Sequence, residues 1–212
     1  MNISVCMLTY NRYDLLLRTL DSLSGIPLTL VDNGSTDGSA EFVARWGGIC
    51  NQDGNKTVGH GMNIAINEAV KDNPDVVLFT ADDYEYKPGW VEKLVTFWAN
   101  AAPEIALASC HLEDYWPWNQ IDGMGHAGGV PFVTRASLPG SNWSFRAADA
   151  HLIMPIAETT GGEDLAVCKR LRADGRKLAA LDLAIHTGER QSAWGNESWR
   201  YAQPIDRSLY GF

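Results

Sequence analysis

Two adjacent aspartates, Asp82 and Asp83, follow an apolar run over residues 76–79 after only two intervening residues. Burial makes a carboxylate costly to ionise, and a second carboxylate beside it adds repulsion, unless a cation neutralises both. Mg²⁺ is held in proteins by one or two carboxylates together with phosphate oxygens. The pair therefore indicates a cation site. The alternative is a surface turn that is acidic by chance, which is the commoner explanation of an isolated Asp-Asp pair.

His186 ends the last apolar run, over residues 177–185. Imidazole is a common ligand of divalent metals, and together with Asp83 it would complete a metal site. A single histidine is more often structural. The other four histidines of the sequence have no comparable setting.

Glu163 and Asp164 form a second acidic pair, at the start of a predicted helix over residues 164–172. Acidic side chains are favourable near a helix N-terminus, which explains the pair without any chemistry. If one of the two is buried and its pKa is raised, it could instead act as a general base.

Two further polar segments follow predicted strands. Asp32 stands directly after the run 28–31, where its carboxylate could accept a hydrogen bond from a nucleobase. A plain strand-to-helix turn explains Gly34, Ser35 and Asp37 but does not explain Asp32. The segment 55–63 contains two glycines that would let the backbone approach a ligand, ahead of a helix N-terminus that favours an anion. A simple loop-to-helix connection is the alternative for this second segment.

Apolar runs and helix-like segments alternate through the first half of the chain, which predicts an α/β fold with a parallel sheet covered on both faces. Ligands of such folds bind at the carboxyl ends of the strands, where these polar clusters fall. We expect Asp14 to cap the first helix and residues 111–143 to be loops over one end of the sheet. The expected strands are residues 3–9, 28–31, 49–50, 76–79, 105–110 and 177–185.

The chain has 212 residues, a formal net charge of −9 and an apolar fraction of 45%, as expected for one globular domain. The acidity argues against a general nucleic-acid binder and against an anchor on anionic lipid. No apolar run reaches the roughly 20 residues of a membrane span, and the N-terminus is not a signal peptide. Four scattered cysteines indicate a reducing, cytoplasmic compartment.

The motifs taken in order resemble a family 2 glycosyltransferase with the GT-A fold. They are T-Y-N-R, V-D-N-G-S-T-D-G-S, N-x-x-x-G-x-x-x-N, V-V-L-F-T-A-D-D-Y-x-Y-x-P-G-W, G-G-E-D-L-A-V-C-K-R-L-R-x-x-G and a final His, spread over residues 1–188. The resemblance implies a Rossmann-like, mostly parallel sheet flanked by helices, with a loop-rich acceptor-side half. It divides the single domain 1–212 into a nucleotide-sugar-binding half (1–103), an acceptor-binding half (104–188) and an aromatic C-terminal tail (189–212).

The same resemblance implies roles for individual positions. Asp164 would be the base that activates the acceptor, with Glu163 as its companion, and Asp83 and His186 would bind Mn²⁺ or Mg²⁺. Asp32 would recognise the base, commonly uracil, and Asp82 would lie near the ribose or donor sugar. The other positions implied to line the donor pocket are Thr9, Tyr10, Arg12, Asn55, Gly59 and Asn63.

Two departures from the family pattern affect the donor site. Thr80 replaces the usual first aspartate, so metal binding would rest mainly on Asp83 and His186. Gly61-Met62-Asn63 replaces a common A-R-N, so a frequent donor-contacting arginine is missing. On the acceptor side, Trp116, Trp118 and Trp143 could stack on the acceptor, although these side chains could equally bury loops.

The resulting hypothesis is a metal-dependent enzyme that moves one sugar, with inversion, from a nucleotide-diphosphate-sugar to a hydroxyl. The expected donor is a UDP-sugar and the expected acceptor a glycan or glycoconjugate. Three alternatives stay open: a sugar nucleotidyltransferase, a non-catalytic binding module, and a glycosyltransferase acting on modified DNA. The last needs a basic patch built from Lys169, Arg170, Arg172, Arg176 and Lys177.

Overall fold

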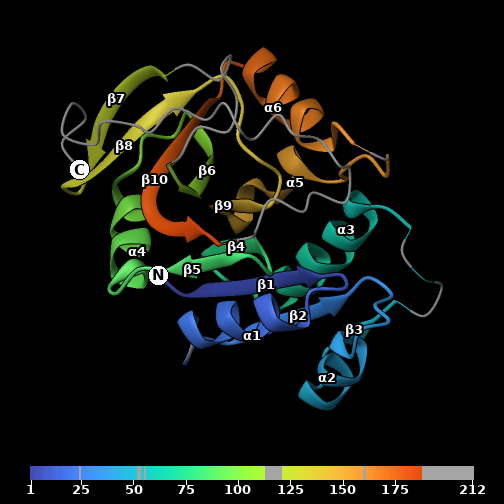
Figure 1. Ribbon diagram of the computed structural model, residues 1–212. Coiled ribbons are helices and arrows are strands. Elements are labelled where there is room, and N and C mark those ends of the chain that lie inside the picture. Colours follow the sequence, from blue (N-terminus) through green and yellow to red (C-terminus); the bar gives the residue numbers. More distant parts are fainter. Residues whose placement is uncertain (24, 52–53, 55, 113–120, 160, 188–212) are drawn as a thin grey trace.

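Within the described residues, ten strands join into one sheet in the computed structural model of the chain (Figure 1). The structure describes residues 1–212 apart from 24, 52–53, 55, 113–120, 160 and 188–212. The strands follow the order β3-β2-β1-β4-β9-β6-β10-β8-β7, and β5 pairs with β10 outside this path.

The first half of the sheet is parallel, as the alternating pattern predicts. Its strands are β1 (Ile3–Thr9), β2 (Leu28–Asp32), β3 (Ile49–Cys50) and β4 (Val76–Ala81). The connecting helices are α1 (Tyr13–Ser22), α2 (Ser39–Trp46) and α3 (Val58–Ala69), with a 3₁₀ turn at Val70–Asp72. Strands β1 and β4 are buried over most of their length, which is why their sequences are continuously apolar.

The second half mixes the two strand directions. Strand β9 runs antiparallel between β4 and β6, while β6 and β10 are parallel. The hairpin β7-β8 adds to the outer edge of β10. The strands of this half are β5 (Tyr84–Tyr86), β6 (Ile105–His111), β7 (Ile121–Ala127), β8 (Val130–Arg135), β9 (Asn142–Arg146) and β10 (Lys177–His186).

The prediction that residues 111–143 form loops is wrong for the described part of that stretch. Residues 121–127 and 130–135 are paired strands, joined through Gly128 and Gly129, which have φ values of +59° and +84°. Only glycine adopts such angles readily, and a Gly-Gly turn is a hairpin signal. Two glycines stand at alternate positions of β7, on its less exposed face. The alternation of apolar and polar side chains that would mark a strand is therefore weak.

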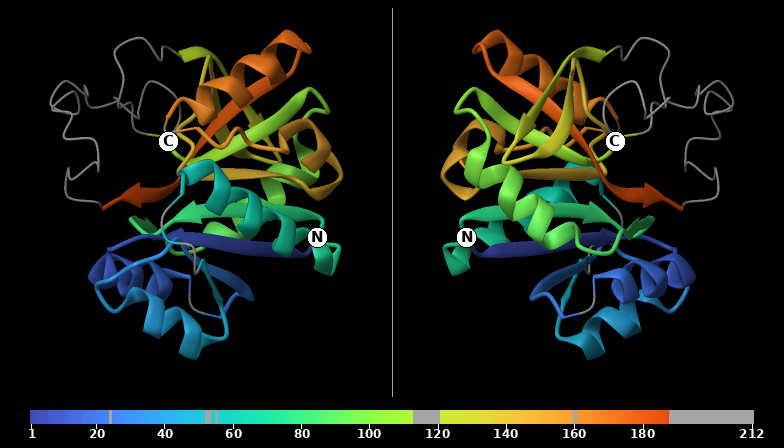
Figure 2. Two further views of the ribbon diagram at one scale, coloured as in Figure 1. Left: turned by 90° about the vertical axis from the view of Figure 1, so that its right-hand side faces the viewer. Right: turned by 90° about the vertical axis from the view of Figure 1, so that its left-hand side faces the viewer.

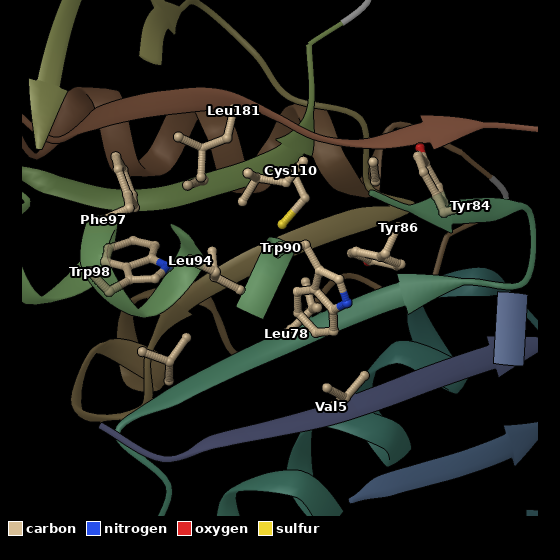
Figure 3. Close-up of a cluster of buried hydrophobic side chains, with 14 of the residues drawn as sticks. Val5, Leu78, Tyr84, Tyr86, Trp90, Leu94, Phe97, Trp98, Cys110 and Leu181 are labelled. Carbon is tan, nitrogen blue, oxygen red and sulfur yellow. The ribbon is translucent and has the colours of Figure 1, made fainter. Parts of the chain in front are cut away.

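Helices cover the two faces of the sheet (Figure 2). One apolar core holds side chains of α1, α2 and α4 (Trp90–Asn100), and the other holds side chains of α3, α5 (Ala150–Ile153) and α6 (Glu163–Ala173). A 3₁₀ turn, Ala147–Asp149, precedes α5. Figure 3 shows part of the first core, where Trp90 and Leu94 pack over the strands. None of the described helices combines the length and apolarity needed to cross a bilayer.

The prediction that Asp14 caps the first helix is also wrong. Helix α1 begins at Tyr13, so Asp14 lies in its first turn and not at the cap position. The backbone N–H of Tyr13 instead donates to Asp37 Oδ2 at 2.9 Å, while Asp37 Oδ1 accepts from Ser39 N at 3.0 Å. One carboxylate thus serves the N-terminal turns of α1 and α2, and it ties together the loops that follow β1 and β2.

Candidate active site

The parallel strand register gathers the first group of candidate residues at one edge of the sheet. Thr9 ends β1 opposite Asp32, which ends β2, and Leu8 pairs with Ala81, the last residue of β4. Asp82 follows Ala81, so it lies beside Thr9, whose Oγ1 donates to Asp82 Oδ2 at 2.6 Å. The predicted convergence of polar residues at the strand ends is therefore present.

Arg12 neutralises the two adjacent carboxylates. It precedes the first turn of α1, and its Nη1 donates to Asp83 Oδ2 at 2.6 Å and to Asp82 Oδ1 at 3.3 Å. Asp82 and Asp83 are 2% and 5% exposed. Burial and the neighbouring Asp83 charge raise the pKa of Asp82 to about 6, against the opposing effect of Arg12. Burial alone would also raise the pKa of Asp83, but His186 and Arg12 outweigh it and hold that pKa below its usual value.

His186 reaches the acidic pair from the other half of the chain. Its Nε2 lies 3.1 Å from Asp83 Oδ2. Antiparallel pairing of β10 with β5 sets this distance, because His186 is opposite Tyr84 and Thr187 N donates to the Asp83 carbonyl at 2.8 Å. The Tyr84 ring packs edge-on against the imidazole, with centroids 5.1 Å apart.

Asp83 and His186 fit part of a divalent-metal site. Asp83 Oδ1 is buried and has no hydrogen-bond partner among the described residues, so one hard oxygen ligand is unused. Within the same residues, no group of three His, Cys, Asp or Glu side chains could hold a metal by itself. Since Mg²⁺ commonly combines one or two carboxylates with phosphate oxygens, the remaining ligands would have to come from a bound diphosphate.

Asp32 presents one free carboxylate oxygen at the end of β2. Its Oδ2 accepts hydrogen bonds from Gly34 N at 2.9 Å and Ser35 N at 3.0 Å. Its Oδ1 is buried and has no hydrogen-bond partner in the described part of the chain. A buried acceptor of this kind is unfavourable unless a donor arrives, so the geometry suits a ligand N–H.

Gly59 and Asn63 lie inside α3, which begins at Val58 because the Thr57 hydroxyl caps it by accepting from His60 N. The Asn63 side chain makes two hydrogen bonds to the backbone of Ile156, at 2.8 and 2.9 Å. A Cβ on Gly59 would come within 2.2 Å of the Ala157 carbonyl oxygen. Both residues hold α3 against the segment 156–158, and their predicted contact with a donor stays a prediction.

Some predicted positions take no direct part in these contacts. Tyr10 is half-buried beside Thr9. Asn55, Trp116 and Trp118 lie outside the described residues, as does the tail 189–212.

Trp143 is not an acceptor platform. It lies in β9, in the middle of the sheet, and it is completely buried. A ring with no exposed surface has no face to offer an acceptor, so the structure supports the alternative that this tryptophan fills the core.

Glu163 and Asp164 occupy the first turn of α6, after Gly162 with φ +77°. Asp164 Oδ1 accepts from Leu165 N at 2.7 Å, and Oδ2 accepts from Gly140 N at 3.3 Å. Burial raises the pKa of both carboxyls, in each case against opposing backbone hydrogen bonds. A partly buried carboxylate with a raised pKa is what a general base requires.

A short connection joins Asp164 to the acidic pair. Gly140 N donates to Asp164, and the next residue, Ser141, lies 2.7 Å from the Tyr84 hydroxyl through its Oγ. The Ser141 carbonyl also accepts from Ala81 N at 2.7 Å. The sequence did not single out Tyr84 or Ser141, because neither belongs to a residue pattern that predicts a catalytic or binding role.

The five cations of the predicted DNA-binding patch do not form one patch: three lie on α6 and two follow it. Arg170 donates to the carbonyls of Leu152 and Ile153, and Arg176 donates to that of Pro103. Lys177 pairs with Glu104. Arg172 Nη2 lies 3.8 Å from Asp122 Oδ2. Arg172 and Lys169 border a pocket of about 370 Å³, whose other lining residues are Ala136, Ser137, Leu165 and Cys168.

Several solved structures share the fold of this chain at low sequence identity. TarS 1-349 from S. aureus superposes with a TM-score of 0.66 at 18% identity, covering 88% of this chain and 60% of that one. GalNAc-T7, crystallised with UDP, GalNAc and Mn²⁺, gives 0.64 at 13% identity and covers 87% and 43%. Glucosyl-3-phosphoglycerate synthase from Mycobacterium tuberculosis, with Mn²⁺, UDP-glucose and phosphoglyceric acid, gives 0.60 at 17% identity and covers 94% and 76%.

These likenesses confirm the GT-A fold, although the chain spans only 60% and 43% of the TarS and GalNAc-T7 chains. No curated protein matches the sequence. The family model described as "Glycosyl transferase family 2" matches residues 4–147, which is more than half of the chain and includes the strand ends that carry Thr9, Asp32 and the Asp82-Asp83 pair. The chain belongs to glycosyl transferase family 2.

Proposed function

We propose that this chain transfers a single sugar from a UDP-sugar to a hydroxyl acceptor, with inversion at the anomeric carbon. One observation carries the proposal: Asp32, the Asp82-Asp83 pair and His186 meet at one edge of the sheet, and Gly140 and Ser141 connect that edge to Asp164. The glucosyl-3-phosphoglycerate synthase from Mycobacterium tuberculosis holds UDP-glucose and Mn²⁺ in a similar fold, which supports the choice of donor.

Each residue has a role that its surroundings support. Asp32 Oδ1 would accept the N3–H of uracil, since a buried free acceptor favours a donor there. Thr9 would orient Asp82 toward the ribose or sugar. Asp83 and His186 would hold Mn²⁺ or Mg²⁺. When bound, such an ion stabilises the negative charge that develops on the diphosphate leaving group.

Asp164 would take the proton of the acceptor hydroxyl as that oxygen attacks the anomeric carbon. Its two backbone hydrogen bonds fix the carboxylate in place, and burial keeps its pKa raised. Attack by the acceptor on the face opposite the diphosphate gives inversion in one displacement. Glu163 would be the acidic companion of Asp164 and would not itself take the proton.

A screen of nucleotide-sugars with Mn²⁺ and with Mg²⁺, read by nucleotide release, tests the proposal. Released UDP is expected. Pyrophosphate released from UTP and a sugar phosphate would instead identify a nucleotidyltransferase, and binding without donor turnover would identify a non-catalytic module. The anomeric configuration of the product, measured by NMR, decides between inversion and retention.

The acceptor arm of the screen should compare glycans with hydroxymethylated DNA. Three of the five cations needed for a DNA-binding patch are committed to carbonyls or to Glu104, and the chain carries a net charge of −9. We therefore expect transfer to the glycan and none to the DNA.

A further inference from the structure

Asp83 Oδ2 serves two positively chargeable groups at once. Arg12 Nη1 lies 2.6 Å from it and His186 Nε2 lies 3.1 Å from it. Arg12 also contacts Asp82, so a single guanidinium charge stands against two buried carboxylates. Its side chain is 31% exposed, whereas the side chains of the two aspartates are 3% and 7% exposed.

This arrangement conflicts with a metal bound by Asp83 and His186. When Nε2 donates a hydrogen bond to the Asp83 carboxylate it carries a proton, so this nitrogen has no lone pair to offer a metal. A divalent ion on Asp83 would also lie within a few ångströms of the guanidinium, where two positive charges repel strongly in a buried setting. Metal binding and the Arg12 contact therefore disfavour one another.

We propose that Arg12 is a displaceable counter-cation, which holds the Asp82-Asp83 pair until a divalent metal and a diphosphate arrive. On their arrival the guanidinium leaves Asp83 and binds the diphosphate. The move needs no change in the sheet, because Arg12 lies ahead of the first turn of α1 and is already partly exposed. A guanidinium suits both partners, since its planar fork binds carboxylate and phosphate oxygens alike.

The proposal rests on the metal site assigned to Asp83 and His186 under the proposed function, but it is tested without donor or acceptor. The full chain is titrated with MnCl₂ in the presence of UDP, and free Mn²⁺ is measured by electron paramagnetic resonance against the same titration without protein. Arg12→Gln keeps a hydrogen-bond donor near the carboxylates and removes the charge, so it should bind Mn²⁺ roughly tenfold more tightly than the wild type. Arg12→Lys keeps the charge and should stay close to the wild type.

Arg18→Gln is the matched control, because Arg18 lies on the same helix and its ion pair with Glu85 is exposed. It should leave Mn²⁺ affinity unchanged. An Arg12→Gln affinity equal to or weaker than that of the wild type overturns the proposal, and so does an absence of Mn²⁺ binding in both. Tight Mn²⁺ binding in a chain that transfers no sugar would overturn only the proposed function.

A measurement on the wild type covers the case in which Arg12→Gln does not fold. Adding Mg²⁺ with UDP should shift the Arg12 Nε–H resonance in a ¹⁵N spectrum and speed its exchange with solvent. The Arg18 resonance should not change. An unmoved Arg12 signal at saturating Mg²⁺ and UDP overturns the proposal.

Discussion

The imidazole of His186 lies 3.1 Å from the carboxylate of Asp83, although 103 positions separate the two residues in the chain. The short antiparallel pairing of β5 with β10 produces this contact. The contact places His186, from the far end of the described chain, at the carboxyl ends of the parallel strands.

Asp83 and His186 should make nucleotide binding depend on a metal. Asp83→Asn removes a carboxylate charge that would face the metal, so calorimetric titration with UDP and Mn²⁺ should show roughly tenfold weaker binding. Treatment with EDTA should weaken UDP binding to the wild type in the same way. Glu85→Gln, which changes an exposed carboxylate two residues away, is the control and should bind UDP normally. Equal UDP affinities with Mn²⁺ and with EDTA would exclude the metal role.

Asp164→Asn should abolish transfer while UDP binding stays near the wild-type value. The amide cannot take the acceptor proton, and general-base catalysis contributes about 10²–10⁴ to a rate. Turnover is followed by UDP release with acceptor present. Glu163→Gln is the matched control in the same helical turn, and its smaller loss would identify Asp164 as the base; the reverse order would assign the base to Glu163.

The raised pKa of Asp164 predicts how activity depends on pH. Burial favours the protonated carboxyl, and only the ionised form can act as a base. As pH falls, kcat/KM should therefore begin to drop at a higher pH than an exposed aspartate, with a pKa near 3.9, would allow. The profile is measured at constant ionic strength. If the residual activity of Asp164→Asn falls over the same acidic pH range as that of the wild type, a group other than Asp164 causes the fall.

Asp32→Asn should change which base the chain prefers. The amide oxygen can still accept from Gly34 N and Ser35 N, while the NH₂ group replaces the free acceptor Oδ1. Uracil offers N3–H to this position, whereas cytosine offers a bare N3. We expect about tenfold weaker UDP binding and a relative gain for CDP. Equal losses for the two nucleotides would show that Asp32 does not contact the base edge.

Gly59→Ala should destabilise the fold more than Gly61→Ala. A Cβ at Gly59 would meet the Ala157 carbonyl carbon and oxygen, which are backbone atoms, at 3.0 and 2.2 Å. At Gly61 it would meet the Leu8 side chain, which can move. Thermal unfolding should show a cost of about 1–3 kcal/mol for the first variant. Similar melting temperatures for the two variants would mean that the segment around Ala157 yields easily.

Much of the parallel half could be predicted from sequence, because fully buried strands are continuously apolar and the helices between them carry a clear apolar face. The hairpin β7-β8 could not. The outer strand, β7, has one exposed face and contains two glycines and an aspartate, so its sequence shows no strong period. The pairing of β8 with β10 sets the position of the hairpin.

The sequence by itself determined where the candidate residues stand relative to the strands. Thr9, Asp32 and the Asp82-Asp83 pair directly follow or end apolar strands, and parallel strands place such ends at one edge. Tertiary structure alone decided how those groups are neutralised and connected. Arg12 pairs with Asp83, Trp143 is buried in the sheet, and Ser141 links Tyr84 to the loop that contacts Asp164. These outcomes depend on strand pairings between distant segments, parallel for β1 with β4 and antiparallel for β4 with β9, whose register no local pattern in the chain specifies.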